Sequence, residues 1–394
     1  MLRRQFIAST LLAFPAIAGR AWATPTPDTR LLVVFLRGGY DATNVFIPTG
    51  SDFYYQSRPT IAVPRPNPAD PKAALPLDAA WSLHPVLRDS IYPLWQKRQV
   101  AFVPFVGTAD LSRSHFETQD TIEMGQPLDA PRDYGSGFMS RLAGELSSSR
   151  PISFTDQLPV SFHGGKVVPN MSVNLSGKPR VDPRQIKLIE EMYQGQALKP
   201  ALTEGFAVRD MVYQSVSAEM TAASRGAVSS KGFSLSARRI ARLMKTDFNL
   251  AFVDVGGWDS HVNQGGSSGY LADRLSELGQ GLAAYADEMG PDWNNTVVVV
   301  ISEFGRTFHE NGDRGTDHGH GSVYWVMGGG IDGGRVAGEQ VALSPASLLQ
   351  NRDYPVLTDY RAMFGGLFKR LYGLNGERLN AVFPNAAPMD LRLV

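Results

Sequence analysis

Continuous apolar runs alternate with amphipathic stretches along most of the chain. The runs are short, and glycine or polar residues follow them, which is typical of fully buried strands and their exit loops. We predict strands in LLVVFLRGGYD (31–41), VAFVPFVG (100–107), FNLAFVDVGGWDSH (248–261), TVVVVISEFG (296–305) and SVYWVMGGG (322–330).

Helical patterns lie between these runs, in SIYPLWQKRQ (90–99), SRSHFETQDTIEMG (112–125), GYLADRLSELGQGLAAYADEM (269–289) and TDYRAMFGGLFKRLYG (358–373). In the third of these, leucines at 271, 275, 278 and 282 fall on one helical face. Strands that alternate with helices predict an α/β fold with a doubly wound, mostly parallel sheet and helices on both faces. We predict one domain over 31–394, with a helical insertion at 182–245.

The N-terminus has the pattern of an export signal. A basic start at Arg3 and Arg4 precedes an apolar run and an Ala-Trp-Ala cleavage site, which predicts a signal peptide over 1–23 and a spacer over 24–30. The adjacent arginines favour a twin-arginine signal, and an ordinary secretory signal is the alternative. We therefore expect contact with the twin-arginine export machinery and a periplasmic or secreted bacterial protein. No later segment is long and apolar enough to span a membrane.

The amino-acid composition excludes several classes of ligand and site. Hydrophobic residues make up 43% of the 394 positions and charged residues 19%, which is typical of a globular protein. Lys+Arg and Asp+Glu are equal at 38 each, so no basic field favours nucleic acid. The chain has no cysteine, which excludes disulfides, thiolate metal sites and a cysteine nucleophile.

Acidic residues and histidines collect where the predicted strands end. They are Asp41 after the first strand, His115 and Asp120 with Ser114 after the second, Asp259 and His261 after the third, Glu303 with Arg306 after the fourth, and Asp317, His318 and His320 in the loop GTDHGHG before the fifth. In open α/β sheets, ligands bind beyond the carboxyl ends of the strands, so we expect these side chains to converge.

Oxygen and imidazole donors without sulfur favour a divalent metal: zinc first, with manganese or magnesium as alternatives. Four nearby carboxylates repel one another unless cations lie between them. The competing interpretation is that each residue only caps its own turn. Gly315, Gly319 and Gly321 would let the backbone turn tightly around bulky ligands, or they simply belong to a flexible loop.

The segments LVVFLRGGYDATN, GWDSH, SEFGRT, ENG, GTDHGHG and VMGGGI, in this order, are similar to the twin-arginine-exported proteins of the domain of unknown function 1501 family. That family is grouped with the alkaline phosphatase and sulfatase-like superfamily. The resemblance covers nearly the whole chain after the signal. It implies an alkaline-phosphatase-like fold and a site for one or two divalent ions, but no settled activity.

The resemblance also implies roles for single residues. Asp41 fits a metal ligand after the first strand, and Asp259 with His261 resembles a ligand pair, at a tighter spacing. The superfamily has Asp-His where this chain has Glu303 and a phenylalanine. A final ligand corresponds to His318 or His320. The expected nucleophile at a helix start corresponds to Ser114, with Thr43 as a second candidate and a metal-bound hydroxide as a third.

Two functions follow from this site. The first is a metal-dependent hydrolase of a phosphate or sulfate ester, of small-molecule or polymer type, in which Ser114 attacks and Arg306 holds a substrate oxygen. The alternative for Arg306 is an ion pair with Glu303. The second function is non-catalytic binding of a metal, a glycan or a protein. The chain has no C/S-x-P-x-R motif, which argues against a formylglycine sulfatase, and His84, His163 and His309 are interpreted as structural.

Overall fold

The predicted apolar runs form one central sheet in the computed structural model, which describes residues 29–171, 189–196, 198–200, 202–205, 207 and 232–394. Among these residues the sheet has eight strands: β1 Arg30–Leu36, β5 Val100–Gly107, β6 Pro151–Phe154, β7 Leu250–Val255, β8 Thr296–Ser302, β9 Ser322–Met327, β10 Arg335–Val336 and β11 Thr358–Asp359. The strand order is β10-β5-β9-β8-β1-β7-β6, and β11 pairs with β5.

The sheet is mixed but mostly parallel. Strand β1 lies between β7 and β8 and runs parallel to both, with Val33 opposite Phe252 on one side and Val299 on the other. Strand β9 is antiparallel to both of its neighbours, β5 and β8. The predicted α/β class with a mostly parallel sheet is therefore confirmed, and β9 is the exception to the parallel arrangement.

Both faces of the sheet are buried. Along β1, Leu32, Val34 and Leu36 pack into one hydrophobic cluster, while the alternate residues Leu31 and Val33 pack into another on the opposite face. This two-sided burial explains why the strands appear in the sequence as continuous apolar runs rather than as alternating patterns.

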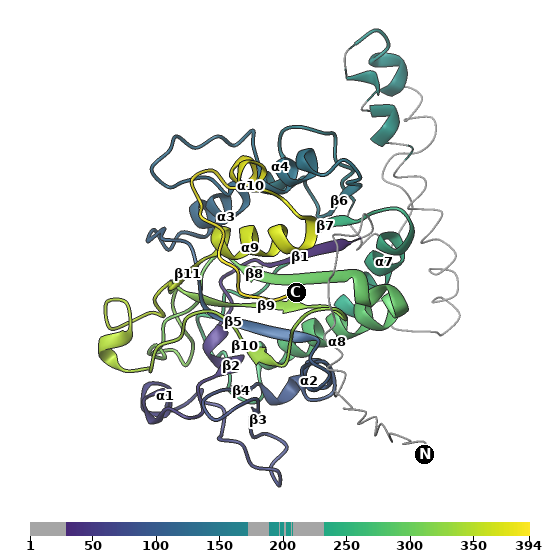
Figure 1. Ribbon diagram of the computed structural model, residues 1–394. Helices are drawn as coiled ribbons and strands as arrows, with labels where there is room; N and C mark the ends of the chain where they lie inside the picture. Colours follow the sequence, from purple (N-terminus) through teal and green to yellow (C-terminus); the bar gives the residue numbers. More distant parts are fainter. Residues whose placement is uncertain (1–28, 172–188, 197, 201, 206, 208–231) are drawn as a thin grey trace, which may run out of the picture.

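Helices cover the two faces (Figure 1). Helices α3, α4, α9 and α10 lie on one side of the sheet, and α2 and α8 lie on the other, with α7 packed against α8. The helices that lie wholly within the described residues are α1 Asp52–Ser57, α2 Ile91–Gln96, α3 His115–Met124, α4 Phe138–Glu145, α7 Phe233–Thr246, α8 Tyr270–Met289, α9 Tyr360–Tyr372 and α10 Gly376–Val382. Short 3-10 helices are η1 Ala42–Asn44, η2 Pro85–Leu87, η3 Val160–Phe162, η4 Gly290–Asn295 and η5 Pro345–Ser347.

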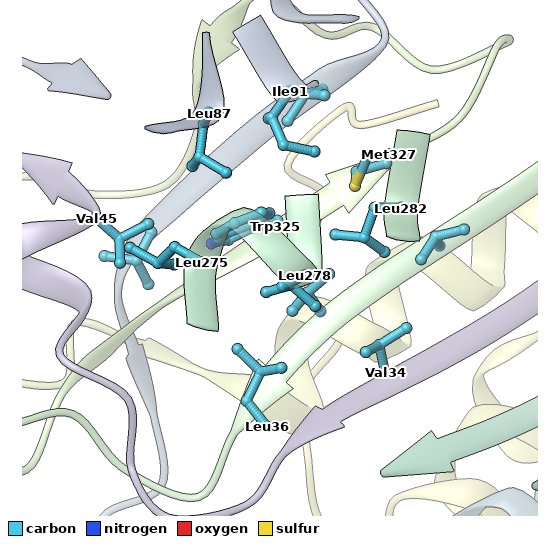
Figure 2. Close-up of a cluster of buried hydrophobic side chains, with 14 of the residues drawn as sticks. Val34, Leu36, Val45, Leu87, Ile91, Leu275, Leu278, Leu282, Trp325 and Met327 are labelled. Carbon is cyan, nitrogen blue, oxygen red and sulfur yellow. The ribbon is translucent and has the colours of Figure 1, made fainter. Parts of the chain in front are cut away.

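The leucines of α8 lie on one helical face, as predicted, and this face packs against the sheet. Leu275, Leu278 and Leu282 are almost completely buried, and each contributes about 1.5–3 kcal/mol through burial. Figure 2 shows them in one cluster with side chains of β1 and β9, among them Val34 and Trp325. A small antiparallel sheet of β2 (Phe46–Ile47), β3 (Leu75–Pro76) and β4 (Ser82–Leu83) adjoins this cluster.

Several predicted segments lie outside the described residues. These include the signal peptide at 1–23 and most of the helical insertion at 182–245, whose last part forms α7. The single domain over 31–394 stays a prediction. In the part of the chain that the structure describes, no helix has the length and apolar character needed to cross a membrane.

Candidate metal centre

Three histidines and one aspartate converge beyond the carboxyl ends of the strands. His115 begins α3, which follows β5, whereas Asp259 and His261 follow β7 and His318 lies between β8 and β9. Strands β5, β7 and β8 point the same way and end at one edge of the sheet. The topology therefore brings together residues that are far apart in the sequence.

The converging atoms lie close together. Nε2 of His318 is 2.9 Å from Nε2 of His115 and 3.1 Å from Nε2 of His261. The carboxylate of Asp259 lies 2.9 Å from Nε2 of His261, 3.3 Å from that of His318 and 3.4 Å from that of His115. Donor atoms of His115, Asp259 and His318 all lie within 4.8 Å of one another, so these residues form a candidate metal-binding triad that His261 adjoins.

The other ring nitrogen of each histidine faces an atom that can only accept a hydrogen bond. The three Nδ1 contacts are His115 to Glu303 Oε1 at 2.8 Å, His261 to Asp317 Oδ1 at 3.2 Å, and His318 to the Arg113 carbonyl oxygen at 3.0 Å. For His115 and His318 this places the hydrogen on Nδ1 and leaves a lone pair on Nε2 of the neutral ring. Nε2 of His261 also faces a carboxylate, that of Asp259 at 2.9 Å, so its acceptors do not select one tautomer. This outer layer of acceptors is the arrangement that orients histidine ligands around metals.

The Nε2 lone pairs of neutral His115 and His318 face each other at 2.9 Å, where they cannot form a hydrogen bond and repel each other. A divalent cation between the Nε2 atoms and the Asp259 carboxylate would turn this repulsion into attraction. The donor set of imidazole nitrogens and one carboxylate oxygen fits zinc. In a tetrahedral zinc site with bonds of about 2.0–2.1 Å, donor atoms lie roughly 3.3 Å apart. The contacts of 2.9–3.4 Å described above agree with that spacing.

Arg306 supplies a fixed positive charge beside this cluster. Its side chain is fully buried and forms an ion pair with Asp259. The guanidinium also donates to the carbonyl oxygens of Gly38, Gly39, Trp258 and Thr316. The ion pair is with Asp259 rather than with Glu303, and the guanidinium also contacts Nε2 of His261 at 3.4 Å. The predicted contact of Arg306 with a substrate oxygen stays a prediction.

These contacts and the burial of the site shift the pKa values of its ionisable groups. The hydrogen bond to Glu303 raises the pKa of His115, whereas burial lowers the pKa of His318. Burial alone would raise the pKa values of Asp259 and Glu303, but hydrogen bonds from Arg306 and His115, respectively, help to lower them. Both carboxyl groups are therefore held as carboxylates.

One side of the cluster is open to solvent. Side-chain exposure is 45% for Asp259 and 40% for His261, compared with 20% for His115 and 27% for His318. A ligand can therefore reach the cluster from the side of Asp259 and His261.

The structure places the other predicted acidic ligands behind or away from the donor atoms. Glu303 is fully buried, and its oxygens accept from His115, Gln119, the Gly38 amide and Ser302. Asp317 stands behind His261 in the same way.

Asp41 has a different partner than expected. Its carboxylate is completely buried and accepts from the guanidinium of Arg58 at 2.6 and 3.0 Å and from Gln264 at 2.5 Å. Arg58 thus neutralises the charge that we assigned to a metal ion. The expectation overlooked this arginine because it lies in a loop region 17 residues further along the chain.

The residues of the GTDHGHG loop lie in different environments. His318 belongs to the cluster and Asp317 stands behind it, but His320 is buried elsewhere, where burial lowers its pKa to about 4. Gly315, Gly319 and Gly321 do not have positive φ, so a left-handed turn is not the reason for glycine.

The candidate nucleophiles differ in access. Ser114 is the N-cap of α3, directly before His115, and its half-buried hydroxyl accepts from the Glu117 amide at a long 3.5 Å. Thr43 is buried in η1. The predicted position of Ser114 at a helix start is observed, and its role as nucleophile stays a prediction.

His115 was expected among the converging residues but was not predicted to be a metal ligand. The signal for that role was present, since His115 follows a predicted strand in the same way as the other site residues. The three histidines interpreted as structural have ordinary environments: His84 caps η2, His163 contacts the Tyr134 carbonyl oxygen, and His309 packs on Phe53.

The fold and the site together define an α/β protein with a histidine-rich candidate metal centre at the carboxyl ends of its strands. The chain belongs to the family described as protein of unknown function (DUF1501), whose model matches residues 105–383. This match confirms the family that the sequence motifs indicated. No curated protein sequence matches the chain.

Solved structures give distant similarities. The crystal structure of Ps i-CgsB in complex with k-i-k-neocarrahexaose has 8% identity and a TM-score of 0.41, over 92% of this chain and 75% of that chain. A protein in the alkaline phosphatase superfamily from Vibrio parahaemolyticus has 11% identity and a TM-score of 0.39, over 87% and 66%. Scores this low carry no argument about activity.

Proposed function

We propose that this chain is an exported, metal-dependent hydrolase of phosphate or sulfate esters that works in the periplasm or outside the cell. The observation that carries the proposal is the convergence of the Nε2 atoms of His115, His261 and His318 on the Asp259 carboxylate. Outer acceptors orient the donor atoms of this cluster, and one side of the cluster is open to solvent. Such an open site suits a catalytic ion, whereas protein ligands enclose a structural ion.

His115, His318 and Asp259 would hold the ion, with His261 as a further ligand. A bound divalent ion would withdraw electron density from an ester oxygen and balance the charge of the transition state. Glu303 keeps the His115 imidazole in the required tautomer, and Asp317 is an acceptor for Nδ1 of His261. Arg306 keeps Asp259 ionised and fixed in orientation.

Ser114 is the proposed nucleophile. Among the described residues, its hydroxyl has a single long contact, to an amide at the start of α3, so it is available to a substrate. The N-terminus of a helix favours negative charge, which would stabilise the serine oxygen as it loses its proton. If water attacks instead, Ser114 contributes only as the helix cap.

The test is hydrolysis of p-nitrophenyl phosphate, bis-p-nitrophenyl phosphate and p-nitrophenyl sulfate by the purified chain. We expect turnover that is removed by a chelator and restored by zinc. His115→Gln should abolish both metal binding and turnover, whereas Ser114→Ala should retain the metal and lose turnover. Turnover that persists in both variants contradicts the proposal, and full turnover in Ser114→Ala alone assigns the attack to water.

A second candidate is a non-catalytic metal-binding protein of the same fold. Asp41, the residue expected to hold a metal after the first strand, is already neutralised by Arg58, which favours a smaller site than an ester hydrolase of two ions requires. Stoichiometric metal without turnover of any ester would support this candidate.

Export is part of the proposal and rests on residues 1–23. Replacement of Arg3 and Arg4 by lysine should leave the protein in the cytoplasm, and fractionation of cells measures this. Unchanged export of the lysine variant would favour the ordinary secretory route.

A further inference from the structure

Helix α3 carries a polar stripe that points at the end of the sheet. His115, Gln119 and Glu123 are spaced by four residues, so they lie on one helical face. None of them is exposed, and Glu123 is buried with only 3% of its side chain exposed. Polar residues on a covered helix face need partners, and these partners form a continuous chain.

The chain begins at Arg37 and ends at His115. Arg37 donates to Gln119 Oε1 at 2.9 Å, and Gln119 Nε2 donates to Glu303 Oε1 at 2.8 Å. The same Glu303 oxygen accepts from His115 Nδ1 at 2.8 Å. Hydrogen bonds between four side chains, from three parts of the fold, thus connect the partly exposed Arg37 to the candidate metal centre.

The chemistry of the two neighbours fixes the orientation of the Gln119 amide. A guanidinium can only donate and a carboxylate can only accept, so the amide oxygen must face Arg37 and the amide nitrogen must face Glu303. If the amide rotated by half a turn, its oxygen would face the carboxylate and its NH2 group would face the guanidinium. Both contacts would then be repulsive.

Arg37 is itself held on every nitrogen. Its Nε donates to Asp254 on β7 at 2.7 Å, and its second terminal nitrogen contacts Glu123 on α3 at 2.8 Å. Glu123 in turn accepts from the Ser161 amide at 3.0 Å. Because Arg37 follows β1 directly, the guanidinium ties the ends of β1 and β7 to α3, the helix that begins with His115.

We propose that Gln119, oriented by Arg37, is a positioning residue for the metal centre: it holds Glu303 in the orientation that fixes His115 with hydrogen on Nδ1 and a lone pair on Nε2. This inference rests on the proposed metal site. It assigns a role to two residues that do not contact the converging donor atoms. Outer residues of this kind change metal affinity about 10- to 100-fold when removed.

The experiment compares Gln119→Glu with Gln119→Met. Both variants are close to glutamine in size. Gln119→Glu keeps an acceptor for Arg37 but loses the donor to Glu303, whereas Gln119→Met loses both. Gln280→Met serves as the control, since Gln280 is exposed on α8 and bonds only to Ser276 on its own helix in the described structure.

Two readouts are measured: the zinc dissociation constant by competition with a chromophoric chelator, and the tautomer of His115 by long-range 1H–15N NMR of the metal-free protein. The His115 signals are assigned by their loss in His115→Gln. We expect the zinc dissociation constant to rise about 10-fold in both Gln119 variants and not in the control. We also expect Gln119→Glu to lose the single Nδ1–H tautomer.

Wild-type zinc affinity and an unchanged His115 tautomer in Gln119→Glu would overturn the inference, because packing and the Arg37 contact alone would then be sufficient. If the wild-type chain binds no zinc, the metal proposal fails. The measurement of the His115 tautomer still tests the inference in that case. A single Nδ1–H form in the wild type that is lost in Gln119→Glu supports the positioning role. Far-UV circular dichroism verifies that each variant is folded. If Gln119→Glu does not fold, the same two measurements on Gln119→Met decide whether the inference holds.

Discussion

The Nε2 atoms of His115 and His318 lie 2.9 Å apart, and in the neutral rings neither nitrogen has a hydrogen to donate to the other. Glu303 fixes the tautomer of His115, and the Arg113 carbonyl oxygen fixes that of His318. In water, two such lone pairs would each bind a solvent hydrogen. Here the fold holds them against each other beside Asp259, so the free energy of this arrangement falls when a cation binds.

Zinc should therefore stabilise the folded protein. At a free zinc concentration of 100 times the dissociation constant, the gain is about 2.7 kcal/mol, visible as a higher melting temperature by calorimetry. His318→Gln should lose most of this gain because one of the three converging imidazole nitrogens is removed. His163→Gln is the control, since His163 is bonded to backbone oxygens elsewhere. An equal zinc-induced shift in His318→Gln and the wild type would rule out this site.

Asp41 and Arg58 form a completely buried ion pair, and breaking it from one side should be costly. Asp41→Asn leaves the Arg58 guanidinium buried without a counter-charge, and we expect a loss of about 3–5 kcal/mol in the free energy of unfolding. The double variant Asp41→Asn/Arg58→Met should lose less than the sum of the single variants.

Urea denaturation measures these losses. The control is Asp52→Asn, which breaks the exposed pair with Arg65 and should cost less than about 1 kcal/mol. A loss in Asp41→Asn as small as in the control, together with loss of bound metal, would instead assign Asp41 to the metal as the family resemblance implies.

The strands were predictable because a sheet buried on both faces requires continuous apolar runs, such as residues 31–36 and 296–302. The direction of β9 was not predictable in the same way. An apolar run has the same composition whether its strand is parallel or antiparallel, and direction depends on how the chain returns to the sheet.

The site was predictable at the level of which residues gather at the sheet edge, because strand ends determine it. Asp259, His261 and His318 were found by that argument. The sequence does not give distances, so it could not show that Glu303 lies behind an imidazole or that Arg58 reaches Asp41. Those outcomes depend on side-chain directions that only the packed structure fixes.

Stability should depend on pH through His84. This side chain is fully buried and faces the Gly266 carbonyl oxygen, and burial lowers its pKa from 6.5 to about 4. Between these values the unfolded chain binds a proton that the folded protein does not, so the free energy of unfolding falls as the pH falls from 7 to 4. The loss from this residue is about 3 kcal/mol at pH 4.

The measurement is urea denaturation between pH 4 and 7 in the presence of a chelator, for the wild type and for His84→Gln. The glutamine cannot gain a proton, so its curve should fall less steeply with decreasing pH. Equal slopes in the two proteins would show that His84 is protonated in the folded state as readily as in the unfolded chain.

Gly319 is required by close packing of two backbone segments. The amide of Gly319 donates to the Gly305 carbonyl oxygen at 2.8 Å, and His318 forms an antiparallel bridge with Arg306. A Cβ atom on Gly319 would lie 2.4 Å from the backbone carbon of Arg306, so Gly319→Ala must push apart the two segments that carry His318 and Arg306. We expect a loss of about 1–3 kcal/mol in the free energy of unfolding.

The same displacement should weaken zinc binding, because His318 would move away from His115 while the ligands themselves stay unchanged. Gly312→Ala, in the same loop, is the matched control: a Cβ atom there meets nothing within 4 Å, and its stability should stay within about 0.5 kcal/mol of wild type. Chelator competition and urea denaturation on both variants decide the point. If Gly319→Ala lost stability but kept full zinc affinity, the loop would support the fold without fixing the position of His318.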